Sequence, residues 1–333
     1  MRLAVVGAGS YGTCLAIHLA SEGHAVKLWT RKSETALEIT ETRENKKYLP
    51  GFVLPETIEV TSSIKTAIHG CGIVVGVTPS HVVRDVYSEV ASCIEDDVIL
   101  VNASKGLEVG TNDRIDQIYQ ELFPAHVAKR ATYLSGPTFA KEVAAHLPSA
   151  IALAGKDERA CEIIQAVFST PSFRVFTTDD VIGVLVGGAL KNIYAICSGL
   201  SDGLGFGHNA RAAIVTRGLA ELSRLGRRLG ADPMTFMGLS GMGDLVLTCA
   251  GDLSRNRRFG LELAKGRTSN EILQNSKHVA EGVKTSKVVK ELSEQQNVEM
   301  PMARFIFEVI HENREARAGL TDLIGRALMK ERD

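Results

Sequence analysis

The first 178 residues alternate between short apolar runs and amphipathic stretches with helical spacing. The apolar runs are rich in Val, Ile and Leu and occupy 3–6, 25–29, 58–61, 73–77, 98–102, 131–134, 149–154 and 173–177. Helical periodicity falls between most of them, for instance at 11–22, 63–69, 80–92, 111–122 and 157–169. Continuously apolar strands that alternate with helices predict βαβ units, right-handed crossovers and a mostly parallel sheet covered on both faces.

The strand pattern stops after residue 178, and the rest of the chain has helical spacing. The first helix is the apolar stretch 181–200, which Asp179 or Asp180 can cap. Further helices are expected near 209–229, 255–264, 279–293, 300–311 and 315–329, after a glycine-rich break at 199–207. The pattern therefore predicts a doubly wound α/β domain over 1–178 and an all-helical domain over 179–333. Because no long linker separates the two domains, we expect a ligand site in their cleft.

Composition and charge exclude several classes of protein. The chain has 333 residues, of which 44% are hydrophobic and 23% charged, as in soluble globular proteins. Its net charge of −1 provides no basic field that would gather nucleic acid. The six cysteines are scattered, no His, Cys or carboxylate cluster has metal-ligand spacing, and the N-terminal apolar run ends at Gly7. We therefore expect a protein of the reducing cytoplasm that has no signal peptide and binds no metal.

One lysine, Lys191, is the only charge in the apolar stretch 181–200. The stretch has the length of a membrane span, but a lysine at its middle would cost about 2.5 to 3.5 kcal/mol on an insertion scale. A core helix without membrane insertion is the better interpretation. A buried ammonium is penalised unless it is paired or deprotonated, which makes Lys191 a candidate acid–base group. The small neighbours Gly187 and Gly188 would leave room for a ligand, whereas the alternative is a lysine that reaches the surface.

The hexapeptide Gly-Ala-Gly-Ser-Tyr-Gly lies between the first predicted strand and the first predicted helix. In such a G-x-G-x-x-G turn, Gly7 permits the tight turn, Gly9 lets the backbone approach a pyrophosphate, and Gly12 lets the helix lie close to the sheet. The helix N-terminus adds free N–H groups and the positive end of its dipole. Ser10 and Tyr11 stand where they could touch the cofactor. The motif predicts a dinucleotide site in a Rossmann-like domain, and the alternative is a glycine-rich turn without a ligand.

Two cations, Arg31 and Lys32, follow the second predicted strand, where an acid would bind a ribose 2′-hydroxyl. The planar guanidinium of Arg31 and the ammonium of Lys32 could pair with a 2′-phosphate instead. This predicts a preference for NADPH, with NADH also accepted. The alternative is that both side chains are solvated at the start of a helix.

Two polar clusters that could converge on Lys191 lie where a predicted strand gives way to a loop or helix. They are 102–106 and 135–142. Lys105 follows a strand, at the edge where doubly wound sheets bind ligands. Gly136 permits close backbone approach, and Thr138 offers a hydroxyl near a helix start. The alternative for Lys105 is a solvated loop lysine.

Two further polar clusters belong to the helical half, at 241–245 and 254–258. Asp244 is an acid in an otherwise apolar segment, and its alternative role is a helix cap. Ser254 can cap a helix while Arg255 faces an anion. A surface turn or a small nucleic-acid patch is the alternative for this cluster, and the balanced net charge argues against the nucleic-acid patch.

Seven short motifs follow one another along nearly the whole chain. They are Gly-Ala-Gly-Ser-Tyr-Gly, Ser-Lys-Gly-Leu-Glu, Ser-Gly-Pro-Thr-Phe-Ala, Gly-Gly-Ala-Leu-Lys-Asn, Gly-Met-Gly-Asp-Leu, Ser-Arg-Asn-Arg-Arg and Val-Ala-Glu-Gly. In this order they resemble the bacterial NAD(P)-dependent glycerol-3-phosphate dehydrogenases. The resemblance implies reversible NAD(P)H-dependent reduction of dihydroxyacetone phosphate to sn-glycerol 3-phosphate, in the cytoplasm and for glycerophospholipid synthesis. The partner is then a small phosphorylated substrate, and the helical domain could offer the surface for a homodimer.

The resemblance also implies roles for individual residues, with Lys191 as the proton acceptor. The implied substrate contacts are Lys105, Gly136, Thr138, Lys191, Asp244, Ser254, Arg255 and Asn256. The implied cofactor contacts, beside Gly7, Gly9 and Gly12, are Ser10, Tyr11, Arg31, Lys105, Ala140, Arg255, Val279 and Glu281. Lys32 is added to them on its charge alone.

Two other functions fit parts of the sequence. A hydroxyacid or sugar-acid dehydrogenase on a similar plan could use Arg255 for a substrate carboxylate. A non-catalytic NADPH-sensing protein would bind the cofactor tightly, but it gives no reason for Lys191, Lys105 and Asp244 to gather at one place.

Overall fold

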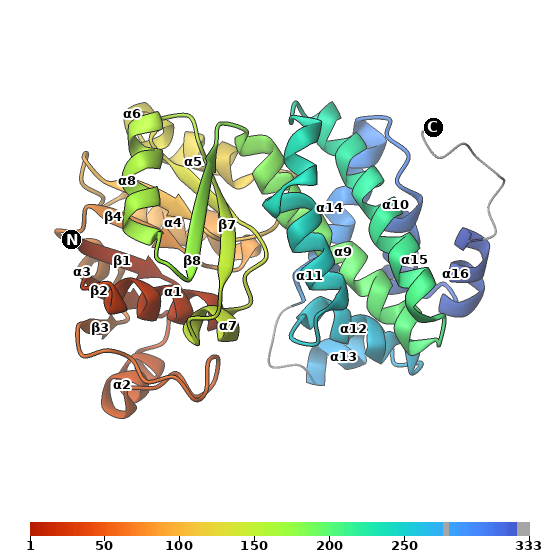
Figure 1. Cartoon of the computed structure of the whole chain (residues 1–333), viewed down its shortest axis with the longest axis horizontal. Helices are drawn as coiled ribbons and strands as arrows, with labels where there is room; N and C mark the ends of the chain where they lie inside the picture. The colour runs from red at the N-terminus through yellow and green to blue at the C-terminus, as the bar shows by residue number, and fades with distance from the viewer. Residues whose placement is uncertain (276–279, 325–333) are drawn as a thin grey trace.

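The computed structural model describes residues 1–275 and 280–324, and Figure 1 shows an α/β part beside an all-helical part. The described chain forms one eight-stranded sheet in the order β3-β2-β1-β4-β5-β6-β7-β8. The strands are β1 (Arg2–Val6), β2 (Ala25–Trp29), β3 (Ile58–Thr61), β4 (Ile73–Gly76), β5 (Ile99–Asn102), β6 (Thr132–Ser135), β7 (Ser149–Gly155) and β8 (Phe173–Thr178). Every pair is parallel except β6 with β7. The mostly parallel sheet and all eight predicted strands are confirmed.

The strand order reverses between β1 and β4, so their carboxyl ends form the switch point at which doubly wound sheets bind ligands. Alternate residues of β1 face opposite sides of the sheet. Leu3 and Val5 pack with one apolar cluster, while Ala4 and Val6 pack with another. Both faces are therefore buried, which explains why the strands are continuously apolar.

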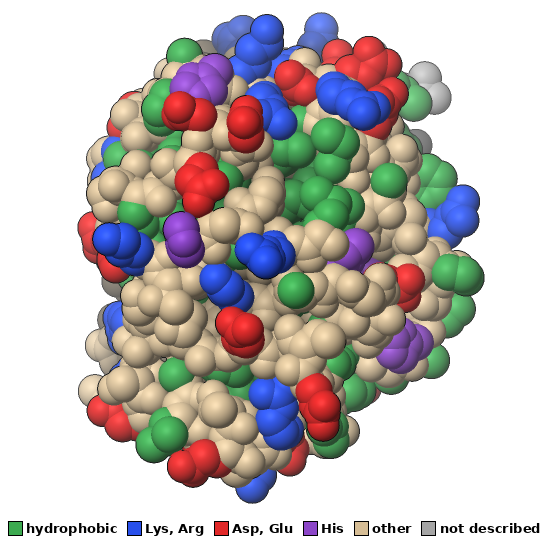
Figure 2. All heavy atoms as spheres, turned by 90° about the vertical axis from the view of Figure 1, so that its left-hand side faces the viewer, with side chains coloured by type: hydrophobic (Ala, Val, Ile, Leu, Met, Phe, Trp, Pro, Cys, Tyr) green, Lys and Arg blue, Asp and Glu red, His purple; other side chains and the backbone are tan. Residues whose placement is uncertain are grey.

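Helices cover both faces of this sheet. They are α1 (Ser10–Ser21), α2 (Ser33–Thr42), α3 (Ile64–Ile68), the 3-10 turn η1 (Ser80–Val82), α4 (Val83–Ala91), α5 (Ile115–Leu122), α6 (Ala125–Lys129), α7 (Ala140–Ala144) and α8 (Glu158–Phe168). α1 and α8 supply residues to one cluster, whereas α4 and α5 supply Tyr87 and Tyr119 to the other. Figure 2 shows acidic and basic side chains interspersed on the outer end of this α/β part, so this face presents no large field of one sign.

The helical part is built around α9 (Val181–Gly203), which Asp180 caps by accepting a hydrogen bond from Gly183 N. Its other elements are α10 (Gly207–Arg228), the turns η2 (Pro233–Met237) and η3 (Leu239–Gly243), α11 (Asp244–Ala250), α12 (Arg255–Ala264), α13 (Ser269–Asn275), α14 (Glu281–Gln295), α15 (Pro301–His311) and α16 (Ala316–Ile324). α9 is long and apolar enough to cross a membrane, but its most apolar window is 94% buried within the protein. It is the core helix that the sequence predicts.

The glycine-rich break predicted at 199–207 is wrong in its extent. α9 continues to Gly203 and the chain turns at 204–206. The reason is that Gly199 serves helix packing: a Cβ there would lie 1.9 Å from the carbonyl oxygen of Arg257. Gly260 on α12 is equally crowded, at 2.1 Å from Ile196 O, so the two helices meet backbone to backbone.

Candidate active site

Lys191 lies on α9 where this helix meets the sheet, and its side chain is 8% exposed. A Cβ at Gly187 would lie 2.4 Å from Ser240 O, and one at Gly188 would lie 2.5 Å from Ser135 Oγ. The expectation that these glycines leave room for a ligand is therefore wrong, since Ser135 and Ser240 fill the space. The glycines instead bring α9 against the carboxyl end of β6, so that Lys191 stands at the strand-end edge of the sheet.

Asp244 joins two lysines from different parts of the chain. Its carboxylate, 2% exposed, accepts a hydrogen bond from Lys191 Nζ at Oδ1 and one of 2.7 Å from Lys105 Nζ at Oδ2. Lys105 follows β5, and its Nζ also donates to Gly136 O at 3.2 Å. Thr248 Oγ1 donates to the backbone oxygen of Asp244 at 2.6 Å. Three of the predicted clusters therefore converge, with two ammonium groups sharing one carboxylate.

The surroundings of Lys191 bring its pKa close to neutral pH. Burial lowers the pKa of Lys191 to about 7, Asp244 opposes the shift, and Lys105 adds to it. Burial by itself would raise the pKa of Asp244, but Lys105 and Lys191 together hold it below the usual value. The carboxylate therefore stays ionised while the lysine can gain or lose a proton near neutral pH, as general acid–base chemistry requires.

The glycine turn has the geometry that a dinucleotide needs. Gly7 has φ +122°, and a Cβ there would lie 2.5 Å from Val77 O. A Cβ at Gly12 would lie 1.8 Å from Gly7 O, so the helix approaches as closely as the motif predicts. Gly9, the N-cap of α1, has no atom within 4 Å of such a Cβ. The turn is thus tightly packed behind and open at the helix N-terminus, which fits a pyrophosphate.

The turn is linked to the lysine cluster by Tyr11. Its hydroxyl lies 2.9 Å from Thr138 Oγ1, and the Thr138 hydroxyl lies 3.3 Å from the same Gly136 carbonyl that Lys105 contacts. Burial raises the pKa of Tyr11 well above its usual value, so the phenol stays protonated. The predicted cofactor turn and the predicted substrate loop therefore form one continuous surface, and Ala140 begins the short α7 beside it.

The two predicted 2′-phosphate ligands lie at the carboxyl end of β2. Arg31 and Lys32 are both exposed, and Lys32 is the N-cap residue of α2. The neighbouring Trp29 carbonyl accepts a hydrogen bond of 3.1 Å from Gly7 N, so β2 ends next to the glycine turn. Burial and then Lys284 and Arg31 lower the pKa of His81, so the charge of Arg31 acts on the loop after β4.

The 254–258 cluster begins α12 and connects to α9 one residue after Lys191. Ser254 caps the helix, accepting from Arg257 N at 3.2 Å. Asn256 Nδ2 donates to Asn192 Oδ1 at 2.9 Å, while Asn256 Oδ1 accepts from Gly282 N at 3.0 Å. Ser254, Asn256 and Arg257 are buried, so a simple surface turn is wrong.

Arg255 itself is exposed at the start of α12, near the carboxylate of Glu281. Glu281 accepts a hydrogen bond of 2.8 Å from Ser80 Oγ, across the boundary between the α/β and helical parts. Arg255 and Glu281, both predicted cofactor contacts in the helical part, therefore lie near Ser80 in the loop after β4. Val279, the remaining predicted cofactor contact, lies outside the described residues.

Three polar residues at the site were missed by the sequence reasoning. Thr248 stands one helical turn after Asp244, a spacing that would have indicated it. Asn192 directly follows Lys191 and holds Asn256. Tyr48 accepts a hydrogen bond of 2.6 Å from Ser10 Oγ at its carbonyl, and Lys47 Nζ lies 5.0 Å from the centre of its ring. In the sequence, only the lysines directly before Tyr48 could have drawn attention to it.

A cavity in the helical part lies apart from this cluster of lysines and carboxylate. Within residues 1–275 and 280–324, no group of three His, Cys, Asp or Glu side chains could hold a metal ion. A cavity of about 450 Å³ lies between α13, α14 and α15, and its lining includes His81 and Lys284 but neither Lys191 nor Asp244.

Comparison with known proteins covers both halves of the chain. Residues 2–161 match the family described as NAD-dependent glycerol-3-phosphate dehydrogenase N-terminus, and residues 180–321 match the C-terminus of the same family. A glycerol-3-phosphate dehydrogenase [NAD(P)+] of Citrifermentans bemidjiense is 46% identical over 330 residues, 99% of this chain and 98% of that protein.

Solved structures agree with these sequence matches. The glycerol-3-phosphate dehydrogenase of Coxiella burnetii superposes with a TM-score of 0.93 at 35% identity, covering 98% of this chain and 99% of its own. A ketopantoate reductase of Ralstonia eutropha has a TM-score of 0.60 at 14% identity, covering 97% and 99%, and shares the fold alone. The resemblance seen in the seven motifs is thus confirmed, and the chain belongs to the NAD-dependent glycerol-3-phosphate dehydrogenase family.

Proposed function

We propose that this protein catalyses reversible hydride transfer between NADPH and dihydroxyacetone phosphate, forming sn-glycerol 3-phosphate for glycerophospholipid synthesis. The observation that carries the proposal is the shared carboxylate: Asp244 holds Lys191 and Lys105 together beside the dinucleotide turn. In this proposal the enzyme acts in the cytoplasm, does not insert into a membrane and does not bind nucleic acid. Its domains are 1–178 for the cofactor and 179–333 for the substrate.

Gly7, Gly9 and Gly12 would hold the pyrophosphate of the nucleotide, and Ser10 and Tyr11 would flank it. When bound, the nicotinamide supplies the hydride. Lys191, as an ammonium, polarises the ketone oxygen and donates a proton to it as negative charge develops there. In the reverse direction, neutral Lys191 takes the proton from the C2 hydroxyl. A pKa of about 7 makes both protonation states accessible near neutral pH.

Asp244 and Lys105 orient the acid–base lysine. The ionised carboxylate fixes the Lys191 side chain, whereas the second ammonium keeps the lysine pKa low. Lys105 also reaches the Gly136 carbonyl, so it can direct the substrate toward the loop that carries Thr138. This arrangement places positive charge where the ketone oxygen becomes negative and needs no metal ion.

The substrate phosphate is assigned to the start of α12. Arg255 is exposed there, the helix N-terminus offers N–H groups, and Asn256 is fixed by Asn192. Holding the phosphate at one end places C2 against the nicotinamide, which reduces the entropy cost of the reaction. A homodimer through the helical domain belongs to the same proposal, and light scattering of the purified protein measures it.

The preference for NADPH rests on Arg31 and Lys32 at the end of β2. Arg31→Asp replaces an attractive charge with one that repels a 2′-phosphate, so KM for NADPH should rise roughly tenfold or more while KM for NADH changes little. Initial rates with each cofactor measure the ratio. An unchanged ratio of the two KM values would remove Arg31 from the cofactor site, and Lys32→Ala tests the weaker assignment in the same way.

The proposed reaction is tested directly by the absorbance of reduced nicotinamide in the presence of dihydroxyacetone phosphate and each cofactor. The rival is a hydroxyacid or sugar-acid dehydrogenase on a similar plan, in which Arg255 would bind a substrate carboxylate. A panel of 2-keto and 3-keto acids separates the two, because a better rate with any of them than with the phosphorylated ketone would overturn the proposal. Tight NADPH binding without oxidation by any ketone would indicate a sensing protein instead.

A further inference from the structure

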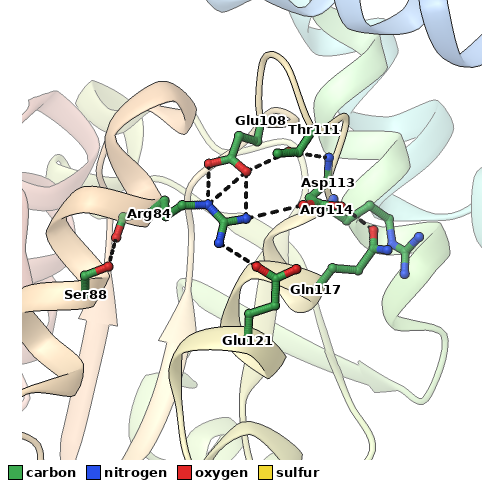
Figure 3. A network of polar contacts seen from close by, with 8 residues as sticks. All are labelled: Arg84, Ser88, Glu108, Thr111, Asp113, Arg114, Gln117 and Glu121. Atoms are coloured by element: carbon green, nitrogen blue, oxygen red, sulfur yellow. Dashed lines mark hydrogen bonds and ion pairs between the residues drawn. The ribbon is translucent and has the colours of Figure 1, made fainter.

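Arg84, on α4, lies at the centre of a cluster of three carboxylates shown in Figure 3. Its Nε donates to Glu108 at 2.9 Å and 3.1 Å, and its Nη2 donates to the same carboxylate at 2.8 Å. The guanidinium also contacts Asp113 at 3.3 Å and Glu121 at 2.5 Å. The Arg84 side chain is 31% exposed and that of Glu108 is 14% exposed, so this fork is partly shielded from water.

Glu108 stands three residues after Lys105, in the loop that follows β5. Between them, Gly106 has φ +144° and a Cβ there would lie 2.6 Å from Ser80 Oγ. Leu107 is 1% exposed and belongs to the apolar core of the helical part. The loop then closes on itself, because Glu108 N donates to Asp113 O at 2.9 Å. A displacement of Glu108 is therefore transmitted to Lys105 through only two residues.

The other end of the Lys105 segment is anchored by hydrogen bonds. Asn102 Nδ2 donates to Ser104 O at 3.0 Å, and Thr78 N donates to Ser104 Oγ at 3.0 Å. Lys105 is thus held from one side by this network and from the other by the buried Leu107 and the contact of Glu108 with Arg84. The upstream anchor consists of buried neutral groups, whereas the downstream anchor combines the buried Leu107 with a carboxylate, Glu108, whose charge is bound by Arg84.

We propose that Arg84 is a positioning residue for the proposed reaction: by fixing Glu108, it holds the 105–108 segment so that Lys105 reaches Asp244. The inference rests on the proposed function and adds to it a residue that touches neither substrate nor cofactor. It acts through the loop, and its effect is felt at the Lys191 cluster by way of the Lys105–Asp244 contact of 2.7 Å.

Electrostatics explains why Arg84 matters for the 105–108 segment. The bonds to Glu108 and Glu121 raise the pKa of Arg84, and the Arg84 guanidinium in turn lowers the pKa of Glu108. Without Arg84, three carboxylates would face one another around a short loop, and their repulsion would drive it outward. A lysine at this position would restore the charge but not the bidentate fork.

If Lys105 is no longer held in position, the pH dependence of kcat should change. Lys105 is one of the groups that lower the pKa of Lys191. If Lys105 moves away from Asp244, Lys191 loses a neighbouring positive charge and keeps its carboxylate, so the pKa of Lys191 rises. The oxidation of glycerol 3-phosphate needs neutral Lys191, and the midpoint of its pH–kcat curve should therefore move to higher pH.

The test compares the full-length Arg84→Met protein with wild type and with Arg84→Lys. We expect kcat/KM for dihydroxyacetone phosphate to fall roughly tenfold and the alkaline shift to be about half a pH unit or more, with partial recovery in Arg84→Lys. The matched control is Arg114→Met, which removes a fork of 3.0 Å and 2.9 Å to Asp116 at the other end of the loop. An unshifted curve in Arg84→Met, or an equal shift in the control, overturns the proposal.

A second measurement stands independently of turnover. Hydrogen exchange of the amides in 103–113 should become at least roughly tenfold faster in Arg84→Met and remain unchanged in the sheet, because only the loop loses its anchor. Protection of the loop equal to that in wild type overturns the proposal even if the protein has another substrate. Failure of the wild-type protein to reduce dihydroxyacetone phosphate, by contrast, refutes the proposed function and leaves this structural readout intact.

Discussion

Lys191 on α9 and Glu221 on α10 are both buried, and burial moves their pKa values toward neutrality from opposite sides. Glu221 contacts α9 through Tyr194, three residues after Lys191. The pKa of Lys191 is lowered to about 7, while that of Glu221 is raised to about 7. Glu221 comes from α10 and accepts hydrogen bonds from Met302 N at 2.8 Å, Ala303 N at 3.2 Å and the Tyr194 hydroxyl at 3.3 Å. Both groups are buried beside α9, but their surroundings differ.

The difference lies in their partners. Glu221 is bound by backbone N–H groups at the start of α15, inside the core of the helical part, where it ties three helices together. Lys191 is bound by the ionised Asp244 of α11, which also binds Lys105 from the loop after β5. This cluster lies at the carboxyl-end edge of the sheet, where doubly wound sheets bind ligands. A shifted pKa therefore marks burial, and position at the strand-end edge is what distinguishes the proposed acid–base group from a structural one.

Lys191→Ala should have the largest effect of the substitutions that test this comparison. Loss of the acid–base group should lower kcat by roughly 10² to 10⁴. Binding of NADPH, followed by nicotinamide fluorescence, should persist because the glycine turn is untouched. Turnover close to wild type would show that Lys191 and Glu221 are both structural.

Asp244→Asn tests the shared carboxylate. Asp244 is the main influence that raises the pKa of Lys191, so its loss should lower that pKa further and move the midpoint of glycerol 3-phosphate oxidation to lower pH. The misplaced lysines should also reduce kcat by roughly 10- to 100-fold. The pH–kcat curve measures both effects, and a shift to higher pH would contradict the assignment.

Glu221→Gln should change stability and leave the chemistry alone. The folded-state pKa of Glu221 lies above its ordinary 4.5, so the folded protein retains a proton that the unfolded chain has lost. The free energy of unfolding therefore falls as the pH rises from about 4.5 through about 7, by up to about 3 kcal/mol. The glutamine variant should lack this decline in urea unfolding at pH 5 and pH 8. A shift of its pH–kcat curve would instead couple Glu221 to catalysis.

Tyr194→Phe is the smallest of the expected effects and sharpens the comparison most, since Tyr194 stands three residues from Lys191. It removes one hydrogen bond of 3.3 Å to Glu221 and should cost about 1 kcal/mol of stability. Thermal unfolding measures this loss. A kcat that stays within about twofold of wild type would show that one turn of α9 separates structure from chemistry.

Local patterns carried much of the prediction. The eight strands could be predicted because strands buried on both faces are continuously apolar, and Lys191 because one charge interrupts an apolar helix. The glycines were harder to interpret. Gly199 indicated a break and Gly187 indicated room for a ligand, but both serve close packing against Arg257 and Ser240. A single sequence gives no sign of which backbone will approach a glycine.

Long-range partners account for what the sequence could not predict. The contact of Tyr194 with Glu221 spans 27 residues, and that of Ser80 with Glu281 spans 201. Nothing in the chain near Arg84 indicates that its guanidinium meets Glu108 in a loop beyond the next strand. Such pairs are set by the packing of whole elements, so only the folded chain shows them.

Leu107 has a mechanical consequence for the whole molecule. It leaves the α/β part and is buried to 1% exposure among helices of the other part, two residues after the lysine that meets Asp244. Withdrawing a leucine from such a pocket into water costs about 2 kcal/mol. Any hinge motion that widens the cleft should therefore turn about this point, so that the leucine acts as a pivot and the reacting groups nearest to it travel least.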